Sequence, residues 1–177
     1  GDGRPLATLY LGTSPGFRKV YARNAEQAQI YSIALNNHDV PAMDDGWLDR
    51  RLLQVRTPIA IAADGYSLQR QGSEWRMGSG GIPDPRELNA LLSSLRSLQV
   101  NGVADEDSQR ELAEAEAELL LDIDSLAGRV TLELFHLGDR YFVLSSEFPY
   151  FFRLGAYHFD RLTGIDALLL SDPPPQP

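Results

Sequence analysis

Residues 59–77 read IAIAADGYSLQRQGSEWRM, and this stretch decides the fold class. Three short runs with strand character are separated by Asp64-Gly65 and Gly72-Ser73. Two-residue Asp-Gly and Gly-Ser connections are typical of the tight turns that join neighbouring antiparallel strands. The stretch therefore predicts three consecutive antiparallel strands.

A helix is predicted directly after these strands, where residues 84–98 read DPRELNALLSSLRSL. Asp84 can cap the helix, Pro85 fits its first position, and Glu87 suits its first turn. The leucines recur three or four residues apart, which places them on one face of the helix. Together, the three strands and this helix form a β-β-β-α unit.

The same plan is predicted on both sides of this unit. The first copy ends in a short helix through Trp47, Leu48, Leu52 and Leu53, and the last copy ends in a short helix around residues 159–170. The runs predicted as strands in these two copies are 6–11, 18–23, 29–35, 130–135, 140–145 and 150–154.

A unit that recurs about every 45 residues is typical of repeat architectures. We therefore predict a β-rich α+β fold of repeated β-β-β-α units, in which short helices pack antiparallel sheets. The predicted boundaries are 1–56, 57–104 and 129–171, followed by an extended Pro-rich tail at 172–177.

Residues 105–128 are predicted as an acidic helix inserted between the second and third units. Ser108 and Glu111 have the spacing of a capping box, and apolar residues recur at helical spacing behind them. Glu114, Glu118 and Asp122 lie four residues apart, where like charges destabilise a helix. This column is expected either to be solvated or to face a basic partner.

Composition excludes several classes of function. The chain has 177 residues, 43% of them apolar, which suffices for a hydrophobic core. It has no cysteine, which excludes disulfides, thiolate metal sites and cysteine nucleophiles. A formal charge of −9 opposes binding to nucleic acid or anionic lipid. No apolar stretch approaches the length of about 20 residues that crosses a bilayer.

No residue pattern indicates a catalytic, cofactor or metal site, so we expect a protein that is not an enzyme. His38, His136 and His158 lack the close spacing of zinc ligands. Ser14 could form a triad with His38 and Asp39, but it lies in a Ser-Pro-Gly turn rather than on a nucleophile elbow. The alternative is that Ser14 has a structural role in that turn. Gly16 would then occupy the turn position that favours a positive φ.

Two further patterns have structural explanations. Asp44, Asp45 and Asp49 could hold calcium, but they lack the spacing of a calcium-binding loop, and helix capping explains the first two. Residues 12–16 are rich in glycine but lack the lysine of a phosphate-binding loop. They are predicted to form the tip of a hairpin.

One dense basic patch stands out on this acidic chain. Arg18, Lys19 and Arg23 lie beside Phe17 and Tyr21, and together they could clamp an acidic group or a loop of a partner. The alternative is that these are ordinary solvent-facing positions of a strand.

A second candidate surface is the aromatic segment that contains Tyr150, Phe151 and Phe152. In a strand, successive side chains point to opposite faces, so these rings cannot all enter one core. Either two layers bury them, which we favour, or some form an exposed patch that binds a partner. The aromatic residues of this segment and its flanks are Phe148, Tyr150, Phe151, Phe152, Tyr157 and Phe159.

The sequence also resembles a bacterial family, domain of unknown function 4340. The resemblance rests on LYLGTSPGFRKVYAR at 9–23, IYSI at 30–33, WLDRRLL at 47–53 and the stretch from Tyr66 to Trp75. It covers the first hundred residues well and the remainder loosely. It implies an upstream membrane anchor, a location outside the cytoplasm and an association with ABC-type transport components, and it supplies no catalytic residues.

These observations predict an extracytoplasmic interaction or scaffolding domain with a protein partner, accessory to a membrane transport system. The membrane would be reached only through an anchor outside this chain, which begins without methionine and is expected to be a fragment. The alternatives are a domain that binds a small ligand or a glycan, and a hydrolase that uses carboxylates gathered by the fold.

Overall fold

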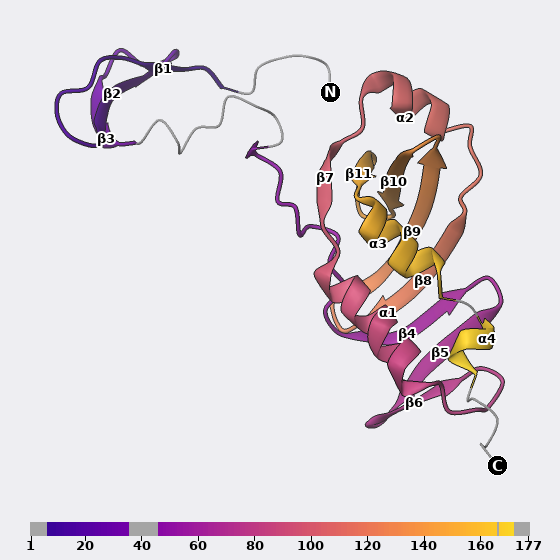
Figure 1. Cartoon of the computed structure of the whole chain (residues 1–177). Coiled ribbons are helices and arrows are strands. Elements are labelled where there is room, and N and C mark those ends of the chain that lie inside the picture. Colours follow the sequence, from indigo (N-terminus) through magenta and orange to yellow (C-terminus); the bar gives the residue numbers. More distant parts are fainter. Residues whose placement is uncertain (1–6, 36–45, 166, 172–177) are drawn as a thin grey trace. The chain divides into compact units, whose positions relative to one another are not determined.

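The computed structural model describes residues 7–35, 46–165 and 167–171 (Figure 1). The chain divides into two compact units, Gly1–Trp47 and Leu48–Pro177.

The first unit contains a three-stranded antiparallel sheet. Its strands are β1 (Leu9–Leu11), β2 (Lys19–Asn24) and β3 (Tyr31–Ala34), with β2 in the centre. Residues 7–35 contain no helix.

The second unit is an eight-stranded antiparallel sheet with four helices in its described part. In chain order the elements are β4 (Pro58–Ala63), β5 (Tyr66–Gln71), β6 (Glu74–Met77), α1 (Pro85–Ser97), β7 (Val100–Val103), α2 (Glu106–Leu112), β8 (Leu119–Ser125), β9 (Gly128–Leu137), β10 (Arg140–Ser145), β11 (Phe151–Leu154), α3 (Ala156–Thr163) and α4 (Ala167–Leu170). The strand order is β6-β5-β4-β8-β9-β10-β11-β7. The β-rich α+β class with antiparallel sheets and short helices is therefore confirmed.

The division of the chain differs from the predicted boundaries. The first unit ends at Trp47 rather than at residue 56. The predicted second and third units share one sheet, because β8 pairs with β4 on one side and β9 on the other. Three meanders of consecutive strands are nevertheless present: β1–β2–β3, β4–β5–β6 and β9–β10–β11.

One face of the large sheet is covered by α1, α3 and α4, which lie in front of it in Figure 1. The predicted start of α1 is confirmed, since the Asp84 carboxylate accepts hydrogen bonds from the backbone N–H groups of Arg86 and Glu87. The leucine stripe of α1 belongs to one hydrophobic cluster with buried side chains from seven strands of the sheet. The core leucines of α1 and its C-cap are Leu91, Leu92, Leu95 and Leu98.

The opposite face of this sheet carries a smaller hydrophobic layer near α2. Its buried members are Ala104, Leu112, Phe135, Phe142 and Phe151. The rings of Phe135 and Phe151 meet edge to face, with their centroids 5.3 Å apart. The sheet is therefore sandwiched by two apolar layers at its β9–β10–β11 end.

The acidic helix predicted over 105–128 is wrong. Helix α2 ends at Leu112, and residues 119–125 form the central strand β8. Its side chains alternate in burial, as a strand requires, so Leu121 and Ile123 are buried while Leu120 is exposed. The predicted capping box is also wrong, because the N-cap is Asp105, which accepts a hydrogen bond from the backbone N–H of Ser108.

The short helix predicted through Trp47 and Leu53 is also wrong, because residues 47–53 form turns. The Asp49 carboxylate accepts a hydrogen bond of 2.9 Å from the backbone N–H of Arg51, a local contact that competes with helix formation. Leu53 is buried in the core of the second unit. The helix predicted around 159–170 is present as two short helices, α3 and α4.

Tyr66 gives a test of this core. Its side chain is buried beneath the layer formed by α1, α3 and α4, its hydroxyl has no hydrogen-bond partner among the described residues, and burial raises its pKa to about 12. The folded protein thus retains a proton that the unfolded chain loses above pH 10, so stability should fall as the pH rises from 10 to 12. In urea unfolding across this range, Tyr66→Phe should remove on the order of 2 kcal/mol of that pH dependence. An unchanged pH dependence in the variant would contradict the burial of this hydroxyl.

Candidate interaction surfaces

The hairpin between β1 and β2 ends in a turn whose central residues are Phe17 and Arg18. The backbone N–H of Lys19 donates to the Gly16 carbonyl over 3.2 Å and closes this turn. Arg18, not Gly16, takes the left-handed conformation, with φ of 54°, so the glycine role predicted for Gly16 is wrong. The Ser14 hydroxyl lies 2.6 Å from both the Gly16 and the Lys19 carbonyl oxygens, so it has a structural role here.

Strand register separates the side chains of the small sheet onto two faces. Leu11 pairs with Ala22, which pairs with Tyr31, and Val20 pairs with Ile33, so these residues share one face. We call it the apolar face, and it carries no charged side chain. Its members are Leu9, Leu11, Val20, Ala22, Asn24, Tyr31 and Ile33.

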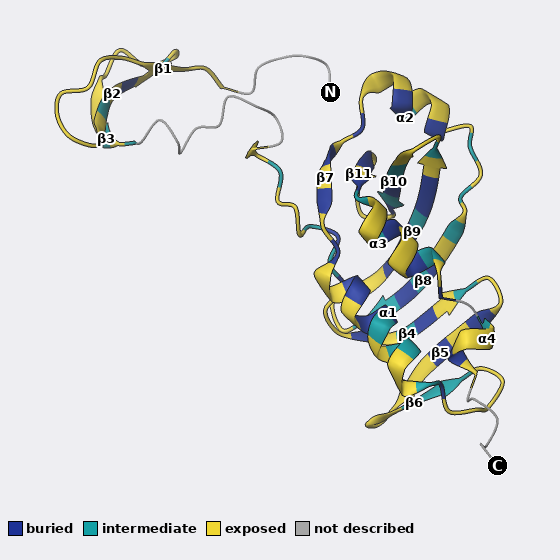
Figure 2. Cartoon of the chain, in the orientation of Figure 1, coloured by how far each residue is buried: buried dark blue, intermediate teal, exposed yellow. Residues whose placement is uncertain are grey.

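The apolar face has little cover from the rest of residues 7–35. Ala22, at its centre, is 4% exposed because the larger side chains around it shield it. Leu9, Leu11 and Tyr31 each expose about half of their surface. Figure 2 shows the contrast with the second unit, whose strands carry many buried residues. A contiguous exposed apolar surface is typical of an interaction site.

The other face of the small sheet combines aromatic and basic side chains. Tyr10 pairs with Arg23, while Lys19 and Tyr21 lie on the same face as Arg23 because they alternate along β2. The guanidinium of Arg23 lies 5.0 Å from the ring centroid of Tyr10, which is a cation–π contact. We call Tyr10, Lys19, Tyr21 and Arg23 the basic-aromatic face.

The predicted basic patch is therefore brought together in part. Lys19, Tyr21 and Arg23 share one face, and Phe17 and Arg18 form the adjacent turn, where the Arg18 guanidinium lies 5.0 Å from the Phe17 ring. Phe17 is 86% exposed. Sequence reasoning missed Tyr10, although its cross-strand position could be inferred once β1 and β2 are aligned.

The aromatic segment is divided between the two layers of the large sheet. Phe152 is buried under the helical layer, and Phe151 is buried in the smaller layer on the opposite face. Burial by two layers is thus confirmed for these two rings, and neither is available to a partner. Phe148 and Tyr150 remain partly exposed, and the Phe148 ring packs edge to face on Phe152 at 5.9 Å.

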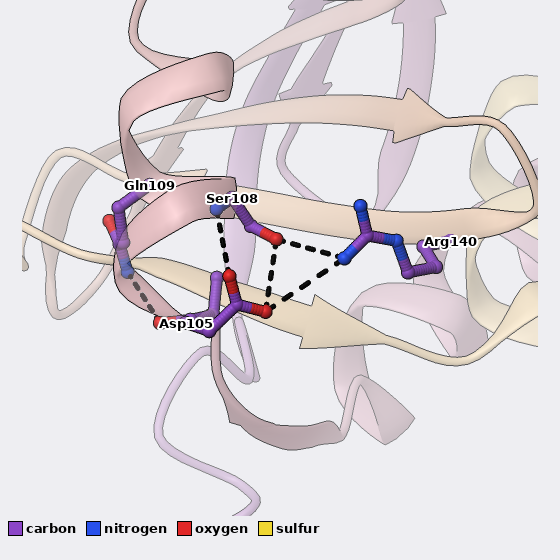
Figure 3. A network of polar contacts seen from close by, with 5 residues as sticks. Asp105, Ser108, Gln109 and Arg140 are labelled. Carbon is purple, nitrogen blue, oxygen red and sulfur yellow. Dashed lines mark hydrogen bonds and ion pairs between the residues drawn. The ribbon is translucent and has the colours of Figure 1, made fainter.

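A polar network fixes α2 to the end of the large sheet (Figure 3). The Arg140 guanidinium donates to the Ser108 hydroxyl over 2.9 Å and lies 3.8 Å from the Asp105 carboxylate. Hydrogen bonds from the Ser108 backbone and side chain, followed by the charge of Arg140, lower the pKa of Asp105. This carboxylate is therefore ionised at neutral pH, where it caps α2.

Gln109 extends the same network to β11. Its side-chain amide donates to the Phe151 carbonyl over 3.0 Å and to the Ala104 carbonyl over 3.3 Å. Its amide oxygen accepts the backbone N–H of Phe151 over 3.1 Å. The side chain of Gln109 thus pairs with the backbone of β11 as a neighbouring strand would.

The described residues of the large unit form no cluster that resembles a metal site. Among the residues that the structure describes, no three histidine or acidic side chains are close enough to hold a metal ion. His136 lies 2.7 Å from Glu118, and burial lowers the pKa of His158. His38 and Asp39, the two residues that a triad with Ser14 would need, lie outside the described residues, as do Asp44 and Asp45. No described helix is long and apolar enough to cross a membrane.

Comparison with known families agrees with the sequence resemblance. Residues 1–122 match the family model described as Domain of unknown function (DUF4340). The chain belongs to the DUF4340 family. The DUF4340 match includes the whole small sheet and continues into β8, so β9–β11 and the last helices lie beyond it. Neither a curated protein nor a solved structure shows significant similarity to the chain.

Proposed function

We propose that this DUF4340 protein is an interaction and scaffolding module rather than an enzyme, and that its small sheet binds a partner protein. One observation carries the proposal: the apolar face has a single buried residue, Ala22, and no charged side chain. A three-stranded sheet with one apolar face is normally packed against another layer.

Covering this face supplies part of the free energy of binding, and the remainder must come from other contacts in the interface. Fully burying a large apolar side chain gains about 1.5–3 kcal/mol. Leu9, Leu11 and Tyr31 are each about half exposed, so covering these three side chains gains about 2–4 kcal/mol. Val20 and Ile33, both partly buried, extend the same contact surface. The absence of charge on this face means that a partner need not desolvate an ion.

The setting that we propose is the extracytoplasmic side of a membrane, where the protein is an accessory to an ABC-type transport system. Support comes from the resemblance to DUF4340 proteins, which implies an upstream membrane anchor. The partner is then a protein component of the transport system, not nucleic acid, which the net charge of −9 disfavours.

Affinity capture of the tagged full-length protein from crosslinked native membranes tests this function. We expect transporter subunits to be enriched, and we expect the double variant Leu11→Asp/Tyr31→Asp to recover about tenfold less of them, because it places charges on the apolar face. Leu126→Asp is the matched control, since Leu126 is 75% exposed in the second unit. Equal recovery by both variants, or no transporter subunit with the native protein, would contradict the proposal.

A further inference from the structure

An open groove of about 630 Å³ lies on the face of the large sheet that carries the smaller hydrophobic layer. Strands β9, β10 and β11 contribute to its floor, and the turn between β10 and β11 contributes to its rim. Its volume is within the range of about 300–1,000 Å³ that is typical of ligand pockets. We call it the β10–β11 groove, and all of its lining residues belong to the second unit.

The floor of the β10–β11 groove contains a carboxylate set between apolar side chains. Glu133 is directly opposite Leu144 of β10, and Leu144 is directly opposite Phe151 of β11. On its other side Glu133 is opposite Leu120 of β8. Directly opposite residues share one face of a sheet, so these four side chains form a row. Glu133 is partly buried within this row, where a charge without a counter-ion is unfavourable.

The charged side chains that line the β10–β11 groove are all acidic. A second carboxylate, Glu147, lines the groove, and its lining in the described part of the chain includes no basic side chain. Neither Glu133 nor Glu147 forms an ion pair with any residue that the structure describes. Ala113, the C-cap of α2, also lines the groove, and the carbonyl end of a helix favours cations. The groove therefore favours a positively charged occupant.

Apolar and aromatic surface accompanies these charges. Phe148 lines the groove and is 36% exposed, and its ring packs on Phe152 with the centroids 5.9 Å apart. Leu144 and Phe151 add further apolar surface. A guanidinium group binds well to aromatic rings, and the aliphatic stem of an arginine side chain covers apolar surface. The groove thus has a counterpart for each part of an arginine side chain.

We propose that the β10–β11 groove binds an arginine side chain of another polypeptide, with Glu133 and Glu147 as its counter-charges. The planar guanidinium has five N–H donors and is less strongly hydrated than an ammonium group, which suits a groove that is partly apolar. Free arginine also carries an α-carboxylate, for which the described lining offers no basic partner. Within a polypeptide that charge is absent. This site lies in the second unit and does not rest on the proposed role of the small sheet.

A titration followed by ¹⁵N NMR of the whole 177-residue chain tests the proposal with small probes. Nα-acetyl-arginine amide should shift the backbone amides of Ser146 and Glu147, with a dissociation constant of about 1 mM for a ligand of this size. Nα-acetyl-citrulline amide has nearly the same shape without the charge, and it should bind about tenfold more weakly or worse. Nα-acetyl-arginine, which keeps its free carboxylate, should bind several-fold more weakly than the amide.

Two conservative variants test the counter-charges. Glu133→Gln and Glu147→Gln should each weaken binding of Nα-acetyl-arginine amide by about fivefold or more, because each removes one charge and keeps the size of the side chain. Glu106→Gln is the matched control, since Glu106 is exposed in the first turn of α2 and does not line the groove. It should bind as the native protein does. The NMR spectrum of each variant also shows whether it is folded.

The outcomes that overturn the proposal are specific. Equal binding of the citrulline and arginine amides would show that charge does not select the occupant. Unchanged affinity in both Glu133→Gln and Glu147→Gln would place the cation elsewhere, and equal binding of Nα-acetyl-arginine would remove the preference for a side chain within a polypeptide. None of these results bears on capture of transporter subunits through the apolar face, so the two proposals fail separately.

Discussion

Leu121→Ala is expected to lower the free energy of unfolding of the second unit by about 3 kcal/mol, whereas Leu126→Ala should change it by less than about 0.5 kcal/mol. Leu121 is fully buried at the centre of β8, and truncating it leaves a cavity under the helical layer. Leu126 is 75% exposed in the turn between β8 and β9. Urea unfolding followed by circular dichroism gives both values.

This pair of variants also distinguishes the strand from the predicted helix. In a helix over 105–128, Leu126 lies on the apolar stripe with Leu119 and Ile123, and Leu121 does not. In β8, Leu121 shares the buried face with Ile123. A larger loss for Leu126→Ala than for Leu121→Ala would contradict the position of β8 in the centre of the sheet.

Gln109→Ala is expected to destabilise the second unit by about 2 kcal/mol, because three hydrogen bonds to backbone groups are lost. The Phe151 N–H would be left without its acceptor in a partly buried site. Amide hydrogen exchange at Phe151 should accelerate in parallel with the loss in urea stability.

Two neighbouring variants define the specificity of this effect. Gln109→Glu retains an acceptor for the Phe151 N–H but places a carboxylate beside the Ala104 and Phe151 carbonyl oxygens, so it should not restore stability at neutral pH. Arg110→Ala removes an exposed ion pair with Asp107 and should cost less than about 0.5 kcal/mol. If Gln109→Ala were as mild as Arg110→Ala, the side chain of Gln109 would not hold β11.

Local turn and cap chemistry made part of the fold predictable. The hairpin turns at Asp64-Gly65 and Gly72-Ser73 join strands as expected, with both glycines at positive φ. The start of α1 followed from Asp84 and Pro85 because a cap and a proline act within a few residues of the helix end.

Elements determined by distant pairing were not predictable from local pattern. The leucines and the isoleucine of β8 occur at spacings that fit both the period of a helix and the two-residue period of a strand. Only the pairing with β4 and β9 selects the strand. β7 contains Gly102, which weakens any strand pattern, and it forms by pairing with β11 at the edge of the sheet. Tertiary contacts outweighed local propensity at both places.

The candidate surfaces were predictable to the extent that strand alternation determines them. Alternation required Phe151 and Phe152 to face opposite layers, and both layers are present. The division of the small sheet into an apolar face and a basic-aromatic face depends on the register between β1, β2 and β3, which the separate strand patterns do not specify.

Hydroxyl-radical footprinting with mass spectrometry tests most directly whether the apolar face is an interaction surface. The measurement compares Leu9, Leu11 and Tyr31 in the isolated chain and in the protein within its native membranes, with Leu126 as the exposed reference. We predict that all three side chains are several-fold protected in the membranes while Leu126 reacts equally in both samples. Equal reactivity of Leu9, Leu11 and Tyr31 in the two samples would contradict the proposed role of the small sheet.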